Sequence, residues 1–212
     1  MKRPYVIINC ASSADGKIAF PSRKQTRISC KEDRKRVLGL RKSCDAILVG
    51  IETVLSDDPH LTIRGSREQP IRVVLDSRCR LPKDAKVVSG NAKTIVFVGK
   101  GKAKPIGENI EVIEVKEEKE NFLDLKEVLK ELYNRGVRKL LVEGGGTVIW
   151  SFLKEKLFDE FLVYVRPVII GGKTSPTIAD GEGVESEDEM IRLKIGEVRK
   201  LGEGLLIKYV PG

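Results

Sequence analysis

The stretch "DAILVGIETVLSDDPHLTIR", residues 45–64, joins a buried-strand pattern to a polar segment. Ala46–Val49 is a short apolar run, suited to a sheet that is covered on both faces. Asp57 and Asp58 follow it side by side, and Arg64 closes the stretch. In an open α/β sheet, ligands bind at the carboxyl ends of the strands. The stretch therefore predicts an α/β protein whose strand-end loops face a ligand.

Six further apolar runs, rich in β-branched residues and mostly without alternation, predict strands that are covered on both faces. They are Tyr5–Cys10, Ile71–Leu75, Thr94–Val98, Val112–Val115, Lys139–Val142 and Phe161–Ile170. The segment 190–210 differs, because it alternates and turns at Gly202–Gly204, which predicts an antiparallel hairpin. The charged segment 116–121 predicts a turn.

Helical patterns lie between several of the predicted strands. One helix is expected from a capping box of Ser29 and Glu32 toward Cys44, one through Leu125, Val128, Leu129 and Leu132 with Gly136 after its end, and one from Thr147 to Lys156. Strands that alternate with helices and end in a hairpin predict an α/β protein. We expect a single domain over residues 1–212, without repeats or a low-complexity linker.

The composition of the 212 residues is that of a globular protein, with 41% hydrophobic and 33% charged residues. A net charge of +8 favours anionic partners. Aromatic residues make up only 5%, too few for a surface that stacks nucleic-acid bases, so we expect a phosphorylated small molecule and no nucleic acid. No apolar run approaches the roughly 20 residues of a membrane helix. The start of the chain resembles a strand more than a signal peptide, and we expect a cytoplasmic protein without a membrane partner.

The cysteine and histidine content argues against a metal centre. The spacing of Cys10, Cys30, Cys44 and Cys79 matches no zinc motif, so we expect buried thiols in a reducing compartment. His60 is the single histidine, which excludes a histidine cluster for a metal ion. We therefore expect no metal.

Four polar segments follow predicted strands. In "LLVEGGGTVIW" (140–150), three glycines between a strand and a helix let backbone N–H groups approach a phosphate, although a tight turn explains them equally well. In "VVLDSRCRLP" (73–82), a hydroxyl and two guanidinium groups suit the 2′-phosphate of NADPH, and a solvated basic turn is the alternative. The segment 166–183 suits a ligand-facing loop or an ordinary turn equally well, and Asp15-Gly16 in the segment 9–20 is a turn signal. Residues expected to face one crevice are Asn9, Asp57, Arg64, Ser77, Arg80 and Glu143.

Taken in order, the motifs "SSADGKIA" (12–19), residues 45–64, "RVVLDSRCRLP" (72–82), "VEGGGTVIWSFL" (142–153) and "RPVIIGGKTSPT" resemble a known family. The family that they resemble is that of the stand-alone pyrimidinone 5′-phosphate reductases of riboflavin biosynthesis. Its members are homologous to the reductase half of a bacterial deaminase-reductase. The resemblance implies a dihydrofolate-reductase-like fold, with a mostly parallel central sheet, helices on both faces and a C-terminal antiparallel hairpin. It also implies NADPH as hydride donor and a homodimer. The zinc motifs of the deaminase, H-x-E and P-C-x-x-C, are absent from the sequence.

The resemblance also assigns residues. For the cofactor it implies Ala11, Thr53, Asp57, Ser77, Arg78, Cys79, Arg80, Gly144, Gly145, Gly146 and Thr147. For the phosphorylated pyrimidine it implies Arg27, Ser29, Arg41, Leu61, Arg64 and Glu143. Asp57 and Glu143 are the catalytic candidates, because a carboxylate favours a protonated imine. Two alternatives stay open: a dihydrofolate or other pteridine-type reductase on the same fold, and a non-catalytic nucleotide-binding module.

Overall fold

The computed structural model describes residues 2–23 and 27–212, and the chain divides into two compact units. The first unit contains Leu40–Leu141 and the N-terminal residues up to Tyr5. The second unit contains Val142–Gly212 and the described residues of Val6–Gly39. The expectation of a single domain stays a prediction.

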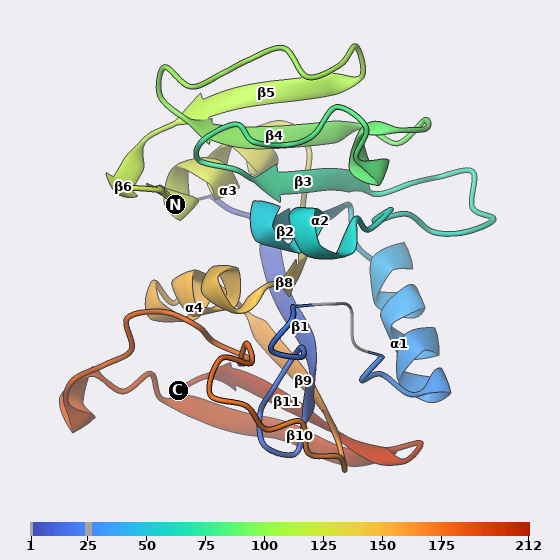
Figure 1. Cartoon of the computed structure of the whole chain (residues 1–212), viewed down its shortest axis with the longest axis vertical. Coiled ribbons are helices and arrows are strands. Elements are labelled where there is room, and N and C mark those ends of the chain that lie inside the picture. The colour runs from blue at the N-terminus through green and yellow to red at the C-terminus, as the bar shows by residue number, and fades with distance from the viewer. Residues whose placement is uncertain (1, 24–26) are drawn as a thin grey trace. The chain divides into compact units, whose positions relative to one another are not determined.

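The first unit is built on parallel strands in the order β2-β3-β4-β5 (Figure 1). Val49, Val74 and Val96 lie side by side on three of them, and all three are buried. Continuous burial of this kind explains why the sequence runs are apolar without alternation. The four strands are β2 (Ala46–Gly50), β3 (Ile71–Leu75), β4 (Thr94–Gly99) and β5 (Ile110–Val115).

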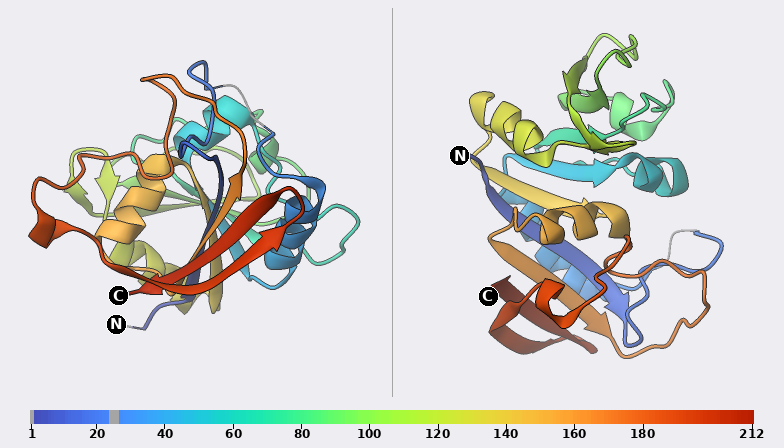
Figure 2. Two further views of the ribbon diagram at one scale, coloured as in Figure 1. Left: turned by 90° about the horizontal axis from the view of Figure 1, so that it is seen from below. Right: turned by 90° about the vertical axis from the view of Figure 1, so that its left-hand side faces the viewer.

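Two helices of the first unit, α2 (Ile51–Asp57) and α3 (Leu125–Asn134), lie on opposite faces of these strands (Figure 2). The predicted apolar positions of α3 are buried, as expected from their helical spacing. Asp124 caps its N-terminus by accepting the backbone N–H groups of the first turn. Gly136 follows its end with φ +89°, which confirms the predicted stop. Helix α2 has only seven residues and begins directly after β2, so its sequence shows no helical period.

The second unit combines parallel and antiparallel pairing. Strand β1 (Tyr5–Ser13) runs parallel to β9 (Glu160–Arg166), and β9 pairs antiparallel with β11. The predicted hairpin is confirmed as β10 (Leu193–Leu201) and β11 (Gly204–Pro211). Mostly parallel strands with an antiparallel C-terminal end confirm the predicted fold class.

The remaining elements of the chain are α1 (Lys31–Lys42), α4 (Gly146–Lys154), β8 (Lys139–Gly144) and the 3₁₀ turns η1 (Lys86–Val88) and η2 (Glu187–Glu189).

Three local predictions need correction. The strand expected to reach Ile170 ends at Arg166, because a proline, which has no N–H to donate, follows it. The turn predicted over 116–121 is confined to residues 120–121, because β6 (Glu117–Lys119) and β7 (Phe122–Leu123) pair around it as a small hairpin. Helix α1 begins one residue later than a cap at Ser29 requires. The sulfur of Cys30 accepts the N–H of Asp33 at 3.4 Å, in place of the expected serine hydroxyl.

Arg72 on β3 is a buried cation, with 1% of its surface exposed. Its guanidinium donates to the hydroxyl of Thr94 at 2.8 Å and to the carbonyl oxygens of Ser89 at 2.8 Å and Ala92 at 2.6 Å. Burial lowers the pKa of Arg72, but a guanidinium stays charged in proteins. The side chain therefore ties the segment before β4 to β3, and its bonds to Thr94 and Ala92 are buried.

We predict that Arg72→Met lowers the free energy of unfolding by about 3 kcal/mol, because it leaves the buried acceptors at Thr94 and Ala92 without this donor. Urea denaturation of parent and variant measures the loss. Arg67→Met is the matched control, since Arg67 is exposed in the same unit. Equal unfolding midpoints for the two variants would contradict the structural role of Arg72.

Candidate functional site

The loop after β3 is shaped by one buried carboxylate. Asp76 has no exposed surface, and its Oδ2 accepts the backbone N–H of Arg80 at 2.5 Å and of Leu81 at 2.8 Å. Cys79 takes a left-handed conformation, with φ +56°, and its N–H donates to the carbonyl oxygen of Asp76 at 2.9 Å. The segment that was expected to contact the cofactor is therefore a tight loop held from inside.

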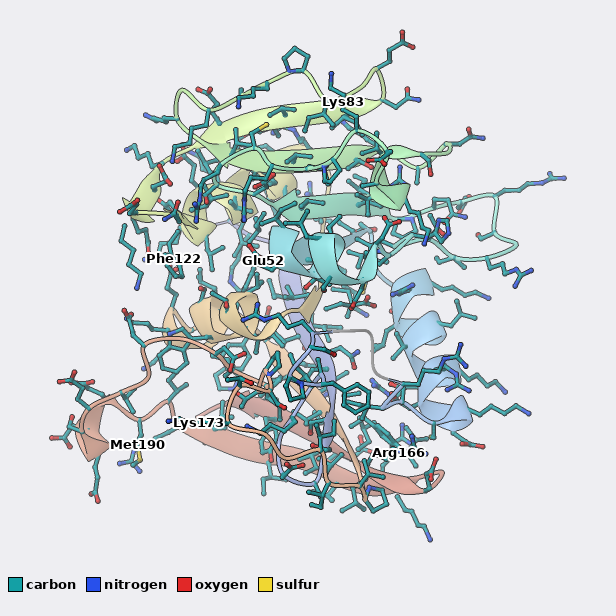
Figure 3. The ribbon with its side chains drawn as sticks, in the orientation of Figure 1. Glu52, Lys83, Phe122, Arg166, Lys173 and Met190 are labelled. Atoms are coloured by element: carbon teal, nitrogen blue, oxygen red, sulfur yellow. The ribbon has the colours of Figure 1, made fainter. Side chains whose placement is uncertain are left out.

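The two arginines of this loop have different surroundings. Arg80 pairs with Glu52 at 2.8 Å and lies 3.6 Å from a carboxylate oxygen of Asp76. Figure 3 shows Glu52 at the start of α2. Arg78 is exposed and has no hydrogen bond or ion pair within the described part of the chain. A phosphate would therefore meet a compensated cation at Arg80 and an uncompensated one at Arg78.

Three residues expected at the substrate come together in the first unit. Arg41 donates to the carbonyl oxygen of Thr62 at 3.5 Å, beside the buried Leu61 and the exposed Arg64. The amide of Gln69 fixes this segment, because it accepts the N–H of residue 63 at 2.7 Å and donates to the carbonyl oxygen of the same residue at 2.9 Å. Sequence reasoning missed Gln69, since a lone glutamine in a polar loop gives no signal. The hydrogen bond from Arg41 thus ties the end of α1 to the loop that carries Leu61 and Arg64.

The neighbouring aspartates have separate tasks. Asp58 takes the left-handed conformation that ends α2, with φ +43°, and its carboxylate accepts the N–H of Lys86 at 2.7 Å. This contact ties the end of α2 to the turn that begins at Lys86. Asp57 is half-buried, and desolvation by burial raises the pKa of its carboxyl above the ordinary value, against a smaller opposing contribution from Ser56. A carboxyl that keeps its proton more readily is suited to proton transfer.

The glycine run lies between β8 and α4, and Gly146 opens the helix. A Cβ at Gly146 would stand 2.6 Å from the carbonyl oxygen of Thr177 and 2.8 Å from Oδ2 of Asp180, so only glycine fits. Asp180 in turn accepts the N–H of Thr177 at 3.0 Å. The absence of a side chain at Gly146 lets the loop of Thr177 and Asp180 pack directly against the start of α4. Asp180 was not among the predicted site residues.

Two further loops of the second unit are joined by Asp15. Its carboxylate accepts the hydroxyl of Ser13 at 2.5 Å and the N–H groups of Ile170 at 3.1 Å and Gly171 at 2.7 Å. These bonds, the one from Ser13 first, lower the pKa of Asp15 to about 2. The carboxylate thereby holds the loop after β1 against the loop after β9.

Asn9 on β1 is oriented by charge. Its Oδ1 accepts from the guanidinium of Arg36 at 2.7 Å, and Arg36 pairs with the fully buried Asp33 at 2.7 Å. Because a guanidinium only donates, the amide oxygen must face it and the amide NH₂ must face away. Cys10, beside this network, is no nucleophile, since burial raises the pKa of its thiol to about 12.

The predicted site residues fall in both units. The first unit carries Arg41, Thr53, Asp57, Leu61, Arg64, Ser77, Arg78, Cys79 and Arg80. The second unit carries Ala11, Arg27, Ser29, Glu143, Gly144, Gly145, Gly146 and Thr147. Arg27 is exposed and Ser29 and Glu143 are partly buried. Their contacts with ligands stay predictions. Within residues 2–23 and 27–212, no group of histidine, cysteine and acidic side chains is gathered to hold a metal ion.

Comparison with known proteins places these features in a family. The profile of the RibD C-terminal domain family matches residues 4–207. A protein of Archaeoglobus fulgidus, named 2,5-diamino-6-ribosylamino-4(3H)-pyrimidinone 5′-phosphate reductase, is 42% identical over 97% of this chain and 97% of its own length. A protein of the same name from Methanothermobacter thermautotrophicus is 40% identical over 98% of both chains. The solved RibD of Acinetobacter baumannii superposes with a TM-score of 0.83 at 28% identity, over 99% of this chain and 58% of that one.

Because Asp57 is half-buried, we expect its charged carboxylate to lower the stability of the folded protein. A folded-state pKa above the unfolded value means that stability falls as pH rises from the unfolded pKa through the folded pKa. Above that window the carboxylate destabilises the fold. We predict that Asp57→Asn is more stable than the parent at pH 7 and that the advantage shrinks toward pH 3.

Thermal unfolding at a series of pH values measures the difference, with Asp84→Asn as a control at an exposed position of the same unit. A variant less stable than the parent at pH 7 would show that the Asp57 carboxylate is held by favourable contacts in the folded state.

Proposed function

Because this chain belongs to the RibD C-terminal domain family, we propose that it is the reductase that converts a ribosylaminopyrimidine 5′-phosphate to the ribitylamino form in riboflavin biosynthesis. The observation that carries the proposal is identity of 40–42% over essentially the full length of two reductases of that name. It is an oxidoreductase whose substrate is a phosphorylated pyrimidine. The structural likeness to RibD supports the dihydrofolate-reductase-like fold.

NADPH is the proposed hydride donor, and two features of the chain fit it. The glycine run precedes the N-terminus of α4, and the N-terminus of a helix favours a negatively charged diphosphate. The loop after β3 offers the hydroxyl of Ser77 and the cation of Arg78 to a phosphate monoester. Thr53, Cys79, Ala11 and Thr147 are proposed to line the same cofactor. When bound, NADPH supplies the hydride that reduces the imine carbon of the opened ribosylamino group.

The protein's own groups are proposed to bind and orient the substrate and to move a proton. Arg41, which donates to the carbonyl oxygen of Thr62, and Arg64, two residues after Thr62, are proposed to bind the 5′-phosphate. The imine nitrogen gains one proton as its carbon gains the hydride. Asp57 is the proposed proton donor, because burial keeps its carboxyl protonated to higher pH. Glu143 is the second candidate, and Arg27 and Ser29 are proposed outer contacts of the substrate.

A cytoplasmic location, without nucleic-acid or membrane partners, is part of the proposal. No helix within the described residues has the length and apolar character that crossing a membrane requires.

The reductase function predicts that the purified protein oxidises NADPH when the ribosylaminopyrimidine phosphate is supplied. Arg64→Ala should lower kcat/KM by about tenfold to a hundredfold, because a charge-assisted contact with phosphate is lost. Absorbance of the reduced nicotinamide measures both results. Arg67→Ala is the matched control from the same loop, since its side chain is also exposed.

Two outcomes would count against this reading. Equal turnover of dihydrofolate would favour a pteridine reductase, and binding of NADPH without turnover of either substrate would favour a nucleotide-binding module. Equal kinetics for Arg64→Ala and Arg67→Ala would remove Arg64 from the substrate site.

We also propose a homodimer formed through β10, the strand at the end of the sheet order. Val198 and Ile195 on this strand are 53% and 67% exposed, although both are large and apolar. If two copies of β10 pair antiparallel about Val198, Glu197 of each copy stands opposite Arg199 of the other. The strand is thus complementary to itself in charge and in apolar character, as a two-fold interface requires.

If β10 pairs with its own copy in this register, reversing one charge should weaken the dimer and reversing both should restore it. Arg199→Glu should weaken dimerisation by about tenfold or more, because it places carboxylates opposite each other. Adding Glu197→Arg to that variant should restore the dimer, since every opposed pair is again of opposite charge. Sedimentation equilibrium of both variants measures the outcome. A double variant as dissociated as the single one would exclude this register, and a monomeric parent would exclude the interface.

A further inference from the structure

The loop after β4 is joined to the loop after β3. Strands β3 and β4 are parallel neighbours, so both loops leave the same edge of the first unit. The N–H of Gly99 donates to the carbonyl oxygen of Ser77 at 3.0 Å. Further along, the sulfur of Cys79 lies 4.0 Å from the carbonyl oxygen of Lys104. Lys104 therefore stands beside the arginine loop, although 25 residues separate it from Cys79 in the sequence.

The backbone of this second loop is held in place. A Cβ at Gly99 would lie 2.8 Å from Oε2 of Glu117 and 3.0 Å from the carbonyl oxygen of Ser77, so the two loops approach as closely as glycine allows. The carboxylate of Glu114 accepts the N–H of Ala103 at 3.1 Å. These contacts fix the main chain that precedes Lys104 and make its position a property of the fold.

The charges on the joined loops are unequally compensated. Arg80 is paired with Glu52 and approaches Asp76, and Lys102 is bound by Glu117 at 2.9–3.0 Å. Lys100 lies near Glu114, whose pKa is lowered first by the backbone N–H of Gly101 and in part by that lysine. Arg78 and Lys104 are both exposed, and neither has an ion pair with the described residues. Two cations on two joined loops thus lack an anion from the protein.

We propose that Arg78 and Lys104 together bind the phosphate monoester at the adenosine 2′ position of NADPH, and that Lys104 sets the preference for NADPH over NADH. The inference rests on the proposed function, because it names how that cofactor is selected. A phosphate dianion gains most from a planar guanidinium on one side and a flexible ammonium on the other. Arg80, held by two carboxylates, is a positioning residue that closes the loop and does not bind the phosphate.

The test measures binding of adenosine 2′,5′-bisphosphate and of 5′-AMP by calorimetry, which requires no turnover. The parent should bind the bisphosphate about tenfold more tightly or better, and Arg78→Gln and Lys104→Gln should each reduce that preference by about threefold to tenfold. Affinity for 5′-AMP should stay unchanged. Lys130→Gln is the control for net charge, since Lys130 is exposed on α3 of the same unit. Salt should weaken the bisphosphate preference of the parent.

Each result bears on one claim. A parent that binds both nucleotides equally, or a Lys104→Gln variant with the preference of Lys130→Gln, overturns the inference. Loss of the preference in Arg80→Gln with its retention in Arg78→Gln would assign the phosphate to Arg80 and overturn it as well. The reductase function would survive all three results, since NADPH-dependent turnover of the pyrimidine tests it separately.

Discussion

The buried carboxylate of Asp76 is the constraint on which the first unit's candidate site depends. A carboxylate with no exposed surface needs hydrogen-bond donors, and it finds them in the backbone N–H groups of Arg80 and Leu81. To supply those donors the chain must turn back at once, with Cys79 in a left-handed conformation. The same turn brings the Arg80 side chain to two carboxylates and leaves Arg78 in solvent. One buried charge thus decides both the loop shape and the side chain that is open to an anion.

Carboxylates act as loop anchors elsewhere in the chain. Asp15, Asp58, Glu114 and Asp180 each accept backbone N–H groups from a neighbouring loop or turn. Such bonds occupy acidic groups within the protein, while basic side chains such as Arg64, Arg78 and Lys104 remain exposed. Part of the net charge of +8 therefore lies on exposed basic side chains of loops that follow strands. This arrangement favours the phosphorylated ligands of the proposed function without a dense basic patch.

The adjacent aspartates show how environment separates identical groups. Asp58 has its charged form stabilised by the backbone N–H of Lys86, which lowers its pKa. Asp57 is half-buried and its pKa moves in the opposite direction. Structural anchoring and proton transfer need these opposite shifts. A two-residue motif therefore supplies a turn anchor and a proposed acid.

The sequence by itself determined the strand pattern, the hairpin, helix α3 and the family. These rest on apolar periodicity, on turn residues and on ordered motifs such as "SDDPHLTIR" and "VEGGG", all of which are local in the chain. The sequence also placed Gly136 after a helix, because backbone conformation restricts residue choice there. Helix α2 escaped detection, since seven residues are too few to show a period.

Only the tertiary structure decided which charges are compensated. "SRCR" presents two equivalent arginines in sequence, and the fold separates them because Glu52 reaches one and not the other. No local sequence pattern pointed to Lys104 or Gln69. Their relevance comes from main-chain contacts with distant or irregular segments. The cap of α1 moved from Ser29 to Cys30 for the same reason: the sulfur also meets the carbonyl oxygen of Leu201. Electrostatic partners are chosen by proximity in space, and a one-dimensional pattern does not contain that distance.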